Sequence, residues 1–118
     1  MQVRRIVANL AALNPAESAA FYHDLLGLEV AMDLGFIVTL AAPASTQEAQ
    51  LSFACEGGSG RPVPDLSIEV DDLDAILPRL SAMGITPEYG PVSEPWNVRR
   101  LMLRDPAGRL INILCHCV

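Results

Sequence analysis

The 118-residue sequence contains no lysine, and no apolar run approaches the ~20 residues that a membrane span requires. Its start has two arginines but no apolar stretch with a small-residue cleavage site, so export by a signal peptide is not expected. Fourteen acidic residues face eight basic ones, all arginine, which gives a net charge of −6. An acidic chain without a basic stripe binds nucleic acid poorly, because neutralised phosphates supply most of that affinity. We therefore expect a cytoplasmic protein that binds neither nucleic acid nor membranes and attracts cationic small molecules.

Cysteine is also scarce: Cys55, Cys115 and Cys117 do not make the even framework of a disulfide-rich secreted domain. The run Cys115-His116-Cys117 could form a metal clip. Residues two apart on a strand share a face, however, so the thiols would point one way and the imidazole the other. The favoured interpretation is a strand end with small apolar thiols, and a metal site in the tail is the less favoured alternative. His23 is expected to be solvated.

The sequence that is present has two similar halves. In the first, Asn14-Pro15 predicts a capped helix start, an apolar stripe follows, and Gly27 ends the helix. In the second, Asp72 is the cap and Gly84 the end. Pro78 falls inside this second helix, where we expect it to cause a kink at a cost of roughly 3 kcal/mol.

Each helix is preceded by one predicted strand and followed by three. The predicted strands are 3–10, 28–33, 36–41 and 50–55 in the first half, and 65–70, 85–89, 98–104 and 109–114 in the second. The fold class is therefore α+β, a single domain over 1–118 with two tandem βαβββ modules. Module 1 covers 1–56, the Gly- and Pro-rich linker 57–64, and module 2 covers 65–118.

Alternation along the strands predicts a cleft. Leu66 and Ile68 alternate with Asp65 and Ser67, so one set faces the helix and the other faces away. Two modules would join into a curved, mixed eight-stranded sheet with helices outside and the away faces around a central trough. The trough would then be lined by Val7, Asn9, Ser52, Asp65, Ser67, Leu110 and Asn112. A mostly apolar cleft with a few polar groups is typical of small-molecule sites.

Three segments carry a family resemblance: "AAFYHDLLGLEV", "IEVDDLDAILPRLSAMGI" and "EPWNVRRLMLRDPAGRLINIL". With the paired βαβββ pattern, they resemble the vicinal oxygen chelate superfamily. This superfamily includes glyoxalases, extradiol dioxygenases, fosfomycin-resistance thiol transferases and bleomycin-resistance proteins. The F-Y-x-D-x-L-G and D-P-x-G motifs are specific for the fold and weak for the chemistry.

The resemblance also implies where a metal would bind. Metal-using members have histidines on the first strand of one or both halves and a glutamate on the last strand of each half. These positions carry Val7, Asp65 and Asn112 here, and the remaining one lies within 50–53, where no residue is acidic. One carboxylate, one amide and a valine are not a transition-metal site, so we expect no metal and no cofactor. A weak Mg²⁺ or Ca²⁺ site at Asp65 is a less favoured alternative. In another, Asn112 bonds a neighbouring strand and Asp65 caps the linker, with no ligand role for either.

Metal-free members such as the bleomycin-resistance proteins bind and sequester a drug, and the resemblance implies this mode here. Trp96, the single tryptophan, could stack on a planar or cationic ligand or anchor its loop instead. Phe36 and Phe53 are more typical of core residues, and one of Arg99 and Arg100 could reach an anionic group. The predicted ligand-binding residues are Trp96, Asp65, Asn112, Asn9, Ser52, Ser67, Phe36 and Arg99.

These observations predict a metal-free binding protein for an aromatic or cationic, antibiotic-like molecule, with no catalytic residue. The alternative is a lyase or dioxygenase with a divalent metal at an atypical site. A third hypothesis is a structural or partner-binding domain with a vestigial cleft. The resemblance further implies a homodimer, since small two-module members often pair.

Overall fold

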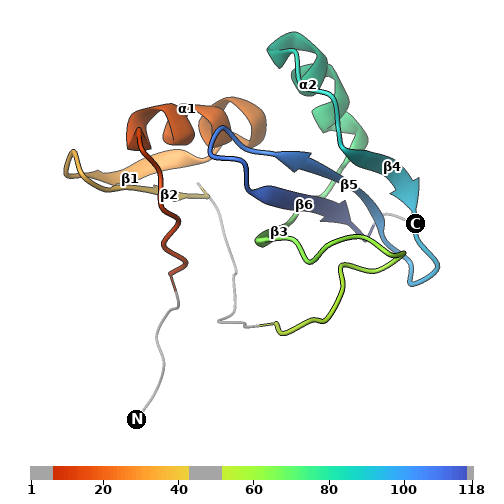
Figure 1. Ribbon diagram of the computed structural model, residues 1–118. Coiled ribbons are helices and arrows are strands. Elements are labelled where there is room, and N and C mark those ends of the chain that lie inside the picture. The colour runs from red at the N-terminus through yellow and green to blue at the C-terminus, as the bar shows by residue number, and fades with distance from the viewer. Residues whose placement is uncertain (1–6, 43–51, 117–118) are drawn as a thin grey trace.

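The computed structural model describes residues 7–42 and 52–116, which form two α-helices, one 3₁₀ turn and six strands (Figure 1). In chain order these are α1 (Pro15–Leu26), β1 (Glu29–Asp33), β2 (Val38–Ala41), β3 (Leu66–Glu69), η1 (Asp74–Ile76), α2 (Leu77–Met83), β4 (Tyr89–Ser93), β5 (Arg99–Arg104) and β6 (Leu110–Cys115). The α+β class is confirmed. Within the described ranges, neither helix has the length and apolar character needed to cross a bilayer.

Helix α1 has the termini that its sequence predicts. The side chain of Asn14 accepts a hydrogen bond from the backbone N–H of Glu17 (3.2 Å), and Pro15 occupies the first turn. The helix ends at Gly27, whose φ of 72° lies in the left-handed region that glycine adopts without strain. Phe21 and Leu25 on the apolar stripe are buried.

The second helix corrects the prediction of a kink at Pro78. Asp72 caps the backbone N–H of Asp74 (3.1 Å), and a 3₁₀ turn precedes α2. The α-helix begins only at Leu77, so Pro78 lies in its first turn. Backbone N–H groups there have no intrahelical partner, and proline therefore removes no hydrogen bond.

The strands form two sheets. β1 and β2 form an antiparallel hairpin, and the four-stranded sheet has the order β3-β6-β5-β4, with β3 parallel to β6. The predicted eight-stranded sheet is not confirmed. Residues 7–10 and 52–55 of two predicted strands form no strand, and the rest of those two segments lies outside the described residues. Alanine and asparagine, frequent around 8–12, fit a half-buried pleated surface poorly.

Strand β4 lies four residues later than the predicted strand 85–89 and includes Pro91. Proline cannot donate to a sheet, but β4 is an edge strand with only β5 beside it. The register also shifts between Tyr89 and Val92, a β-bulge that bends the edge. Glycine and proline are unfavourable inside a central strand, and the edge position of β4 is what permits them here.

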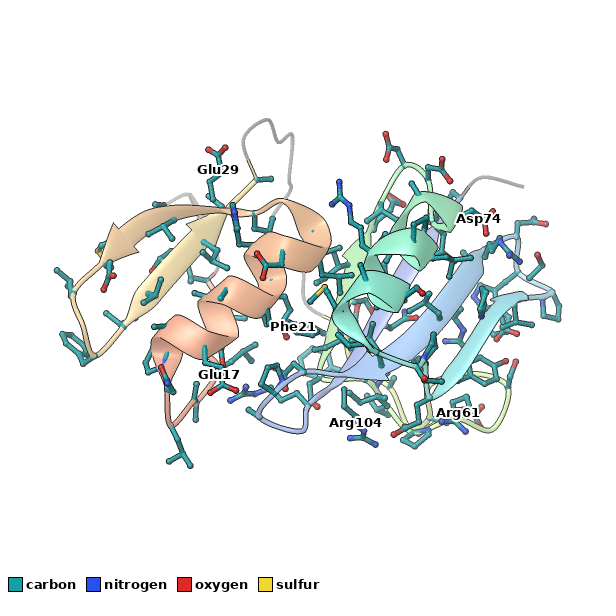
Figure 2. The ribbon with its side chains drawn as sticks, turned by 90° about the horizontal axis from the view of Figure 1, so that it is seen from above. Glu17, Phe21, Glu29, Arg61, Asp74 and Arg104 are labelled. Carbon is teal, nitrogen blue, oxygen red and sulfur yellow. The ribbon has the colours of Figure 1, made fainter. Side chains whose placement is uncertain are left out.

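Both helices cover the same face of the four-stranded sheet (Figures 1 and 2). The predicted alternation of β6 is confirmed, because Ile111 and Ile113 belong to the core under the helices, together with Leu101 and Leu103 of β5. Phe21 extends this core from α1. The linker runs below the opposite face in Figure 1, so that face meets the linker rather than a helix.

Candidate functional site

The face of the sheet opposite the helices carries a group of side chains from three neighbouring strands. Asn112 of β6 is paired with Ser67 of β3 on one side and with Met102 of β5 on the other. Arg100 lies two residues from Met102 and so shares its face. The structure therefore brings the predicted residues Ser67 and Asn112 together.

Asn112 is the least satisfied polar residue of this group. Its side-chain N–H donates to Ser67 Oγ at 3.1 Å, and only 7% of the residue is exposed. Its Oδ1 is buried and has no hydrogen-bond partner among the described residues. Leaving a buried acceptor unpaired costs about 1–3 kcal/mol. Oδ1 of Asn112 is therefore the acceptor in this group that no described residue satisfies.

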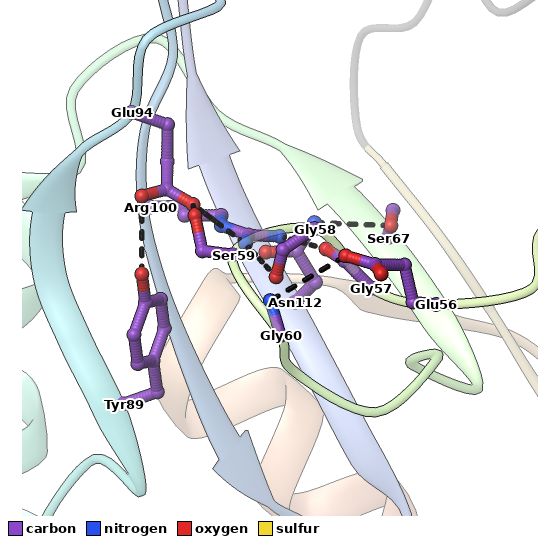
Figure 3. A network of polar contacts seen from close by, with 10 residues as sticks. All are labelled: Glu56, Gly57, Gly58, Ser59, Gly60, Ser67, Tyr89, Glu94, Arg100 and Asn112. Carbon is purple, nitrogen blue, oxygen red and sulfur yellow. Dashed lines mark hydrogen bonds and ion pairs between the residues drawn. The ribbon is translucent and has the colours of Figure 1, made fainter.

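Next to this group lies a buried ion pair between Arg100 and Glu94 (Figure 3). Nη2 of Arg100 is 2.7 Å from Glu94 Oε2, and Nε donates to the same oxygen at 3.1 Å. Glu94 also accepts hydrogen bonds from Tyr89 (3.0 Å) and Ser59 (2.8 Å). Burial alone would raise the pKa of Glu94, but the hydrogen bonds from Ser59, Tyr89 and Arg100 together lower it.

The linker closes over this ion pair as a tight turn, residues 57–61, which we call the linker turn. The backbone N–H of Gly57 donates to the carbonyl of Arg61 (2.7 Å), and that of Arg61 donates to Gly58 (3.0 Å). Arg100 Nη1 donates to the carbonyl of Gly57 at 2.6 Å and Nη2 to that of Gly58 at 3.1 Å. Gly58 has a φ of 85°, and a Cβ there would lie 2.8 Å from Trp96 Cη2. The turn thus requires glycine both for its backbone and for its fit under the indole.

Arginines cover the aromatic rings of this region. The guanidinium of Arg100 lies 5.1 Å from the ring centroid of Trp96 and 5.4 Å from that of Tyr89, and Arg61 lies 4.9 Å from Tyr89. These distances are typical of cation–π contacts. Trp96 is nevertheless 48% exposed, so much of the indole is open to a ligand.

The other predicted site residues lie apart from this group or on another face. Arg99 lies on the face of β5 opposite that of Arg100 and pairs with Asp74 at 3.0 Å. Phe36 lies between β1 and β2, in the separate hairpin, and is 81% exposed. Asn9 and Ser52 are exposed in segments without strand structure. A ligand role for these four residues stays a prediction.

Asp65 immediately precedes β3 and is exposed. Its Oδ2 accepts a hydrogen bond from the backbone N–H of Leu110 at 2.9 Å, so it bonds the neighbouring strand. Glu94 is neutralised by Arg100 and therefore offers no free charge to a cationic ligand. Sequence reasoning missed the Arg100–Glu94 pair and its contacts with the linker turn. The only sequence signal was that Arg99 and Arg100 must point to opposite faces.

The donor set does not fit the metal of the metal-using relatives. Val7 offers no ligand atom, Asp65 bonds Leu110, and Asn112 contributes a neutral amide. Among residues 7–42 and 52–116 no group of three His, Cys, Asp or Glu side chains is placed to hold an ion. Zinc, iron and manganese favour several imidazole, thiolate or carboxylate ligands.

Two open cavities lie elsewhere on the surface. One, of about 520 Å³, lies between the residues before α1 and the turn that joins β5 to β6. The other, of about 350 Å³, lies beside the end of α2. Neither is lined by Trp96 or Asn112.

Solved structures share this fold. The antibiotic-binding protein TnmS3 from Streptomyces sp. CB03234 has a TM-score of 0.66 and 21% identity, over 98% of this chain and 95% of that one. TioX from Micromonospora sp. ML1 has a TM-score of 0.61 and 21% identity, over 96% of both chains. Lactoylglutathione lyase from Agrobacterium tumefaciens has a TM-score of 0.65 and 22% identity, over 97% and 92%.

No curated protein matches the chain. Residues 5–113, nearly the whole sequence, match the family described as the Glyoxalase/Bleomycin resistance protein/Dioxygenase superfamily. The fold, the two motifs and this match agree, and the chain belongs to the glyoxalase/bleomycin resistance protein/dioxygenase superfamily.

Proposed function

We propose that the protein is a cytoplasmic binding protein that captures a small aromatic, antibiotic-like molecule without a metal ion. The ligand would lie on the face of the four-stranded sheet that carries Asn112, with its ring against the exposed part of Trp96. The observation that carries the proposal is the buried Oδ1 of Asn112, which has no partner in the described chain. The resemblance places this residue where metal-using relatives have a glutamate ligand, and an amide there suits a donor on an organic ligand better than an ion.

The antibiotic-binding protein TnmS3 supports this proposal as a relative in fold, because it shows that the architecture can hold a drug. The lactoylglutathione lyase supports the alternative, a metal-dependent enzyme, to the same degree. The side chains favour the binding protein over the enzyme, since Val7, Asp65 and Asn112 are a poor ligand set for a transition metal. The charge of the ligand is less constrained: a cationic ligand is favoured only by the net charge of −6.

A homodimer is part of the same proposal. The β1–β2 hairpin exposes Val30, Met32, Leu34 and Phe36, at 42% to 81% of their surfaces. A two-stranded sheet is marginal by itself in water, and apolar side chains gathered on one element favour burial against another surface. Sedimentation of the purified protein would measure the oligomeric state, and a monomer at micromolar concentration would contradict this part.

The binding function is tested by the fluorescence of Trp96, the only tryptophan, during titration with a panel of planar aromatic drugs. We expect quenching or a spectral shift that saturates. Metal analysis of protein purified without chelators runs beside it, with no stoichiometric transition metal expected. A flat titration across the panel would contradict binding at Trp96. Bound metal on Asp65 and Asn112 would instead favour the enzyme.

A further inference from the structure

We propose that the linker turn, residues 57–61, is an intramolecular stand-in for the ligand. In the free protein its two backbone carbonyls satisfy Arg100, and the ligand must displace them with carbonyl oxygens of its own. This inference rests on the proposed binding function and adds to it a mobile element and a ligand class. The ligand is a planar molecule with neutral carbonyl acceptors and at least one N–H or O–H donor.

The first argument is the way in which the turn is held. Residues 57 to 60 are Gly-Gly-Ser-Gly, so this part of the turn contributes no apolar side chain to any core. Its attachments to the sheet are polar: Gly57 and Gly58 accept from Arg100, and Ser59 donates to Glu94. At the end of the turn, Arg61 adds a partly exposed ion pair with Glu88 at 3.5 Å and the contact with the Tyr89 ring. A segment held by a few hydrogen bonds can open at a small fraction of the free energy of global unfolding.

The second argument is what the turn leaves unsatisfied. Oδ1 of Asn112 is buried without a partner among the described residues, and so is Nε of Arg61 in the turn itself. An optimal cover for this face would pair Asn112 and leave none of its own polar atoms unpaired, as nearly all buried polar atoms in proteins are paired. The turn supplies hydrogen-bond acceptors to Arg100 but no donor to Oδ1 of Asn112. A ligand that supplies acceptors to Arg100 and a donor to Asn112 would satisfy the face better than the turn does.

The third argument is charge, which defines the ligand class. Glu94 already neutralises Arg100, with two hydrogen bonds from the guanidinium to one carboxylate oxygen. The remaining donors of Arg100 point at the carbonyls of Gly57 and Gly58, at 2.6 and 3.1 Å. A ligand carboxylate in their place would meet the nearby charge of Glu94, whereas a ketone or amide oxygen would reproduce the present contacts.

The experiment uses two planar probes, neutral 1,8-naphthalimide with two carbonyls and an N–H, and cationic 9-aminoacridine with no carbonyl. Affinities come from calorimetry on the full chain and on Ser59→Ala, which removes one attachment of the turn. We expect naphthalimide to bind more tightly than aminoacridine, and Ser59→Ala to tighten naphthalimide binding by about threefold to tenfold, the value of one hydrogen bond. Ser81→Ala, at an exposed position on α2, is the matched control and should bind as the parent does.

Hydrogen exchange of residues 57–61 reports the turn directly. Displacement predicts faster exchange of the Gly57 and Arg61 amides when naphthalimide is bound. Gly58→Ala, which would place a methyl group 2.8 Å from Trp96, should act in the same direction as Ser59→Ala.

The outcomes separate this inference from the function on which it rests. Unchanged or slower exchange with bound naphthalimide overturns the stand-in, and so does weaker or unchanged binding by Ser59→Ala. Binding of aminoacridine in preference to naphthalimide overturns the ligand class and leaves a binding function at Trp96. Failure of both probes and of the wider drug panel overturns both proposals.

Discussion

The hydroxyl of Tyr22 donates a 2.9 Å hydrogen bond to the carboxylate of Asp105, 83 residues later in the chain. Asp105 also accepts from the backbone N–H groups of Ala107 (3.0 Å) and Arg109 (2.9 Å), and pairs with the Arg109 side chain. The two family motifs of the sequence therefore meet in space: the tyrosine of F-Y-x-D-x-L-G bonds the aspartate of D-P-x-G. This contact ties α1 to the turn between β5 and β6.

The first prediction concerns this contact. Tyr22→Phe removes the hydroxyl from a buried carboxylate and should lower the free energy of unfolding by about 1–3 kcal/mol, as measured by urea denaturation. Tyr89→Phe is the matched control, because the Tyr89–Glu94 hydrogen bond is only partly buried, so water can replace part of it and the loss should be smaller. Equal losses in the two variants would contradict the importance given to the Tyr22–Asp105 contact.

The same residue predicts an alkaline dependence. Burial, and then the hydrogen bond to Asp105, raise the pKa of Tyr22 above its ordinary value of 10.0. The folded state therefore holds the phenol proton more tightly than the unfolded state, and this stability is complete below pH 10 and lost as the pH rises above it. The difference in unfolding free energy between the parent and Tyr22→Phe should be constant from pH 7 to 9 and shrink above pH 10. If the difference grows above pH 10, the pKa of Tyr22 is not raised in the folded state.

Replacing one partner of the buried Arg100–Glu94 pair should lower the free energy of unfolding more than replacing both. Glu94→Gln leaves the guanidinium of Arg100 buried without its counter-charge, and we expect a loss of about 3–5 kcal/mol. The double variant Arg100→Met with Glu94→Met removes both charges and should recover part of that loss. Thermal and urea unfolding measure both. If the loss in the double variant equals the sum of the losses in Arg100→Met and Glu94→Met alone, the two side chains do not interact.

Acid should weaken the fold through the same carboxylate. Hydrogen bonds lower the pKa of Glu94 from its ordinary value of 4.5 despite its burial. Its contribution is therefore present above pH 4.5 and lost as the pH falls through the lowered pKa of the folded state. The stability difference between the parent and Glu94→Gln should narrow steadily below pH 4.5. If the difference is as large at pH 3 as at pH 7, titration of Glu94 does not cause it.

A binding role for Asn112 predicts a trade-off between stability and affinity. Asn112→Leu removes a buried unpaired acceptor at similar volume, and should leave the free energy of unfolding unchanged or raise it by up to about 1 kcal/mol. The same variant should weaken naphthalimide binding at least about tenfold, because one hydrogen bond to a buried group is lost. Ser67→Ala is the control: it removes the hydroxyl that accepts from the Asn112 side chain and leaves the Oδ1 of Asn112 in place. A large loss of stability in Asn112→Leu, with affinity intact, would mark Asn112 as structural.

Short sequence patterns correctly predicted the termini of α1 and the two faces of β6. Asn14, Pro15 and Gly27 gave α1 its termini, and the alternation around Ile111 and Ile113 assigned the faces of β6 correctly. The predicted kink at Pro78 was wrong because the 3₁₀ turn and the following α-helix share one apolar stripe. The periodicity of that stripe does not show where the α-helix begins. β4 can contain Pro91 because it is an edge strand. Which strand lies at the edge depends on the pairing of the whole sheet, and the local sequence does not show it.

The candidate site was predicted only in part, for the same reason. Ser67 and Asn112 were expected on one face and lie there, since strand alternation fixes both. The Arg100–Glu94 pair depends on a bulged edge strand, and its contacts with Gly57 and Gly58 join segments more than 40 residues apart. Neither residue type nor spacing encodes such a contact, so the linker was taken for a simple spacer.

The position of β6 has a consequence for how the chain is synthesised. This strand lies between β3 and β5 and hydrogen-bonds to both, although it is the last of the six to leave the ribosome. The β4–β5 hairpin can pair as soon as it emerges, but the one neighbour that β3 has among the described strands forms only when residues 110–115 follow. The surface that carries Asn112 therefore forms only after β6 has been synthesised, and nascent chains halted before it would lack the core side chains of β6, Ile111 and Ile113 among them.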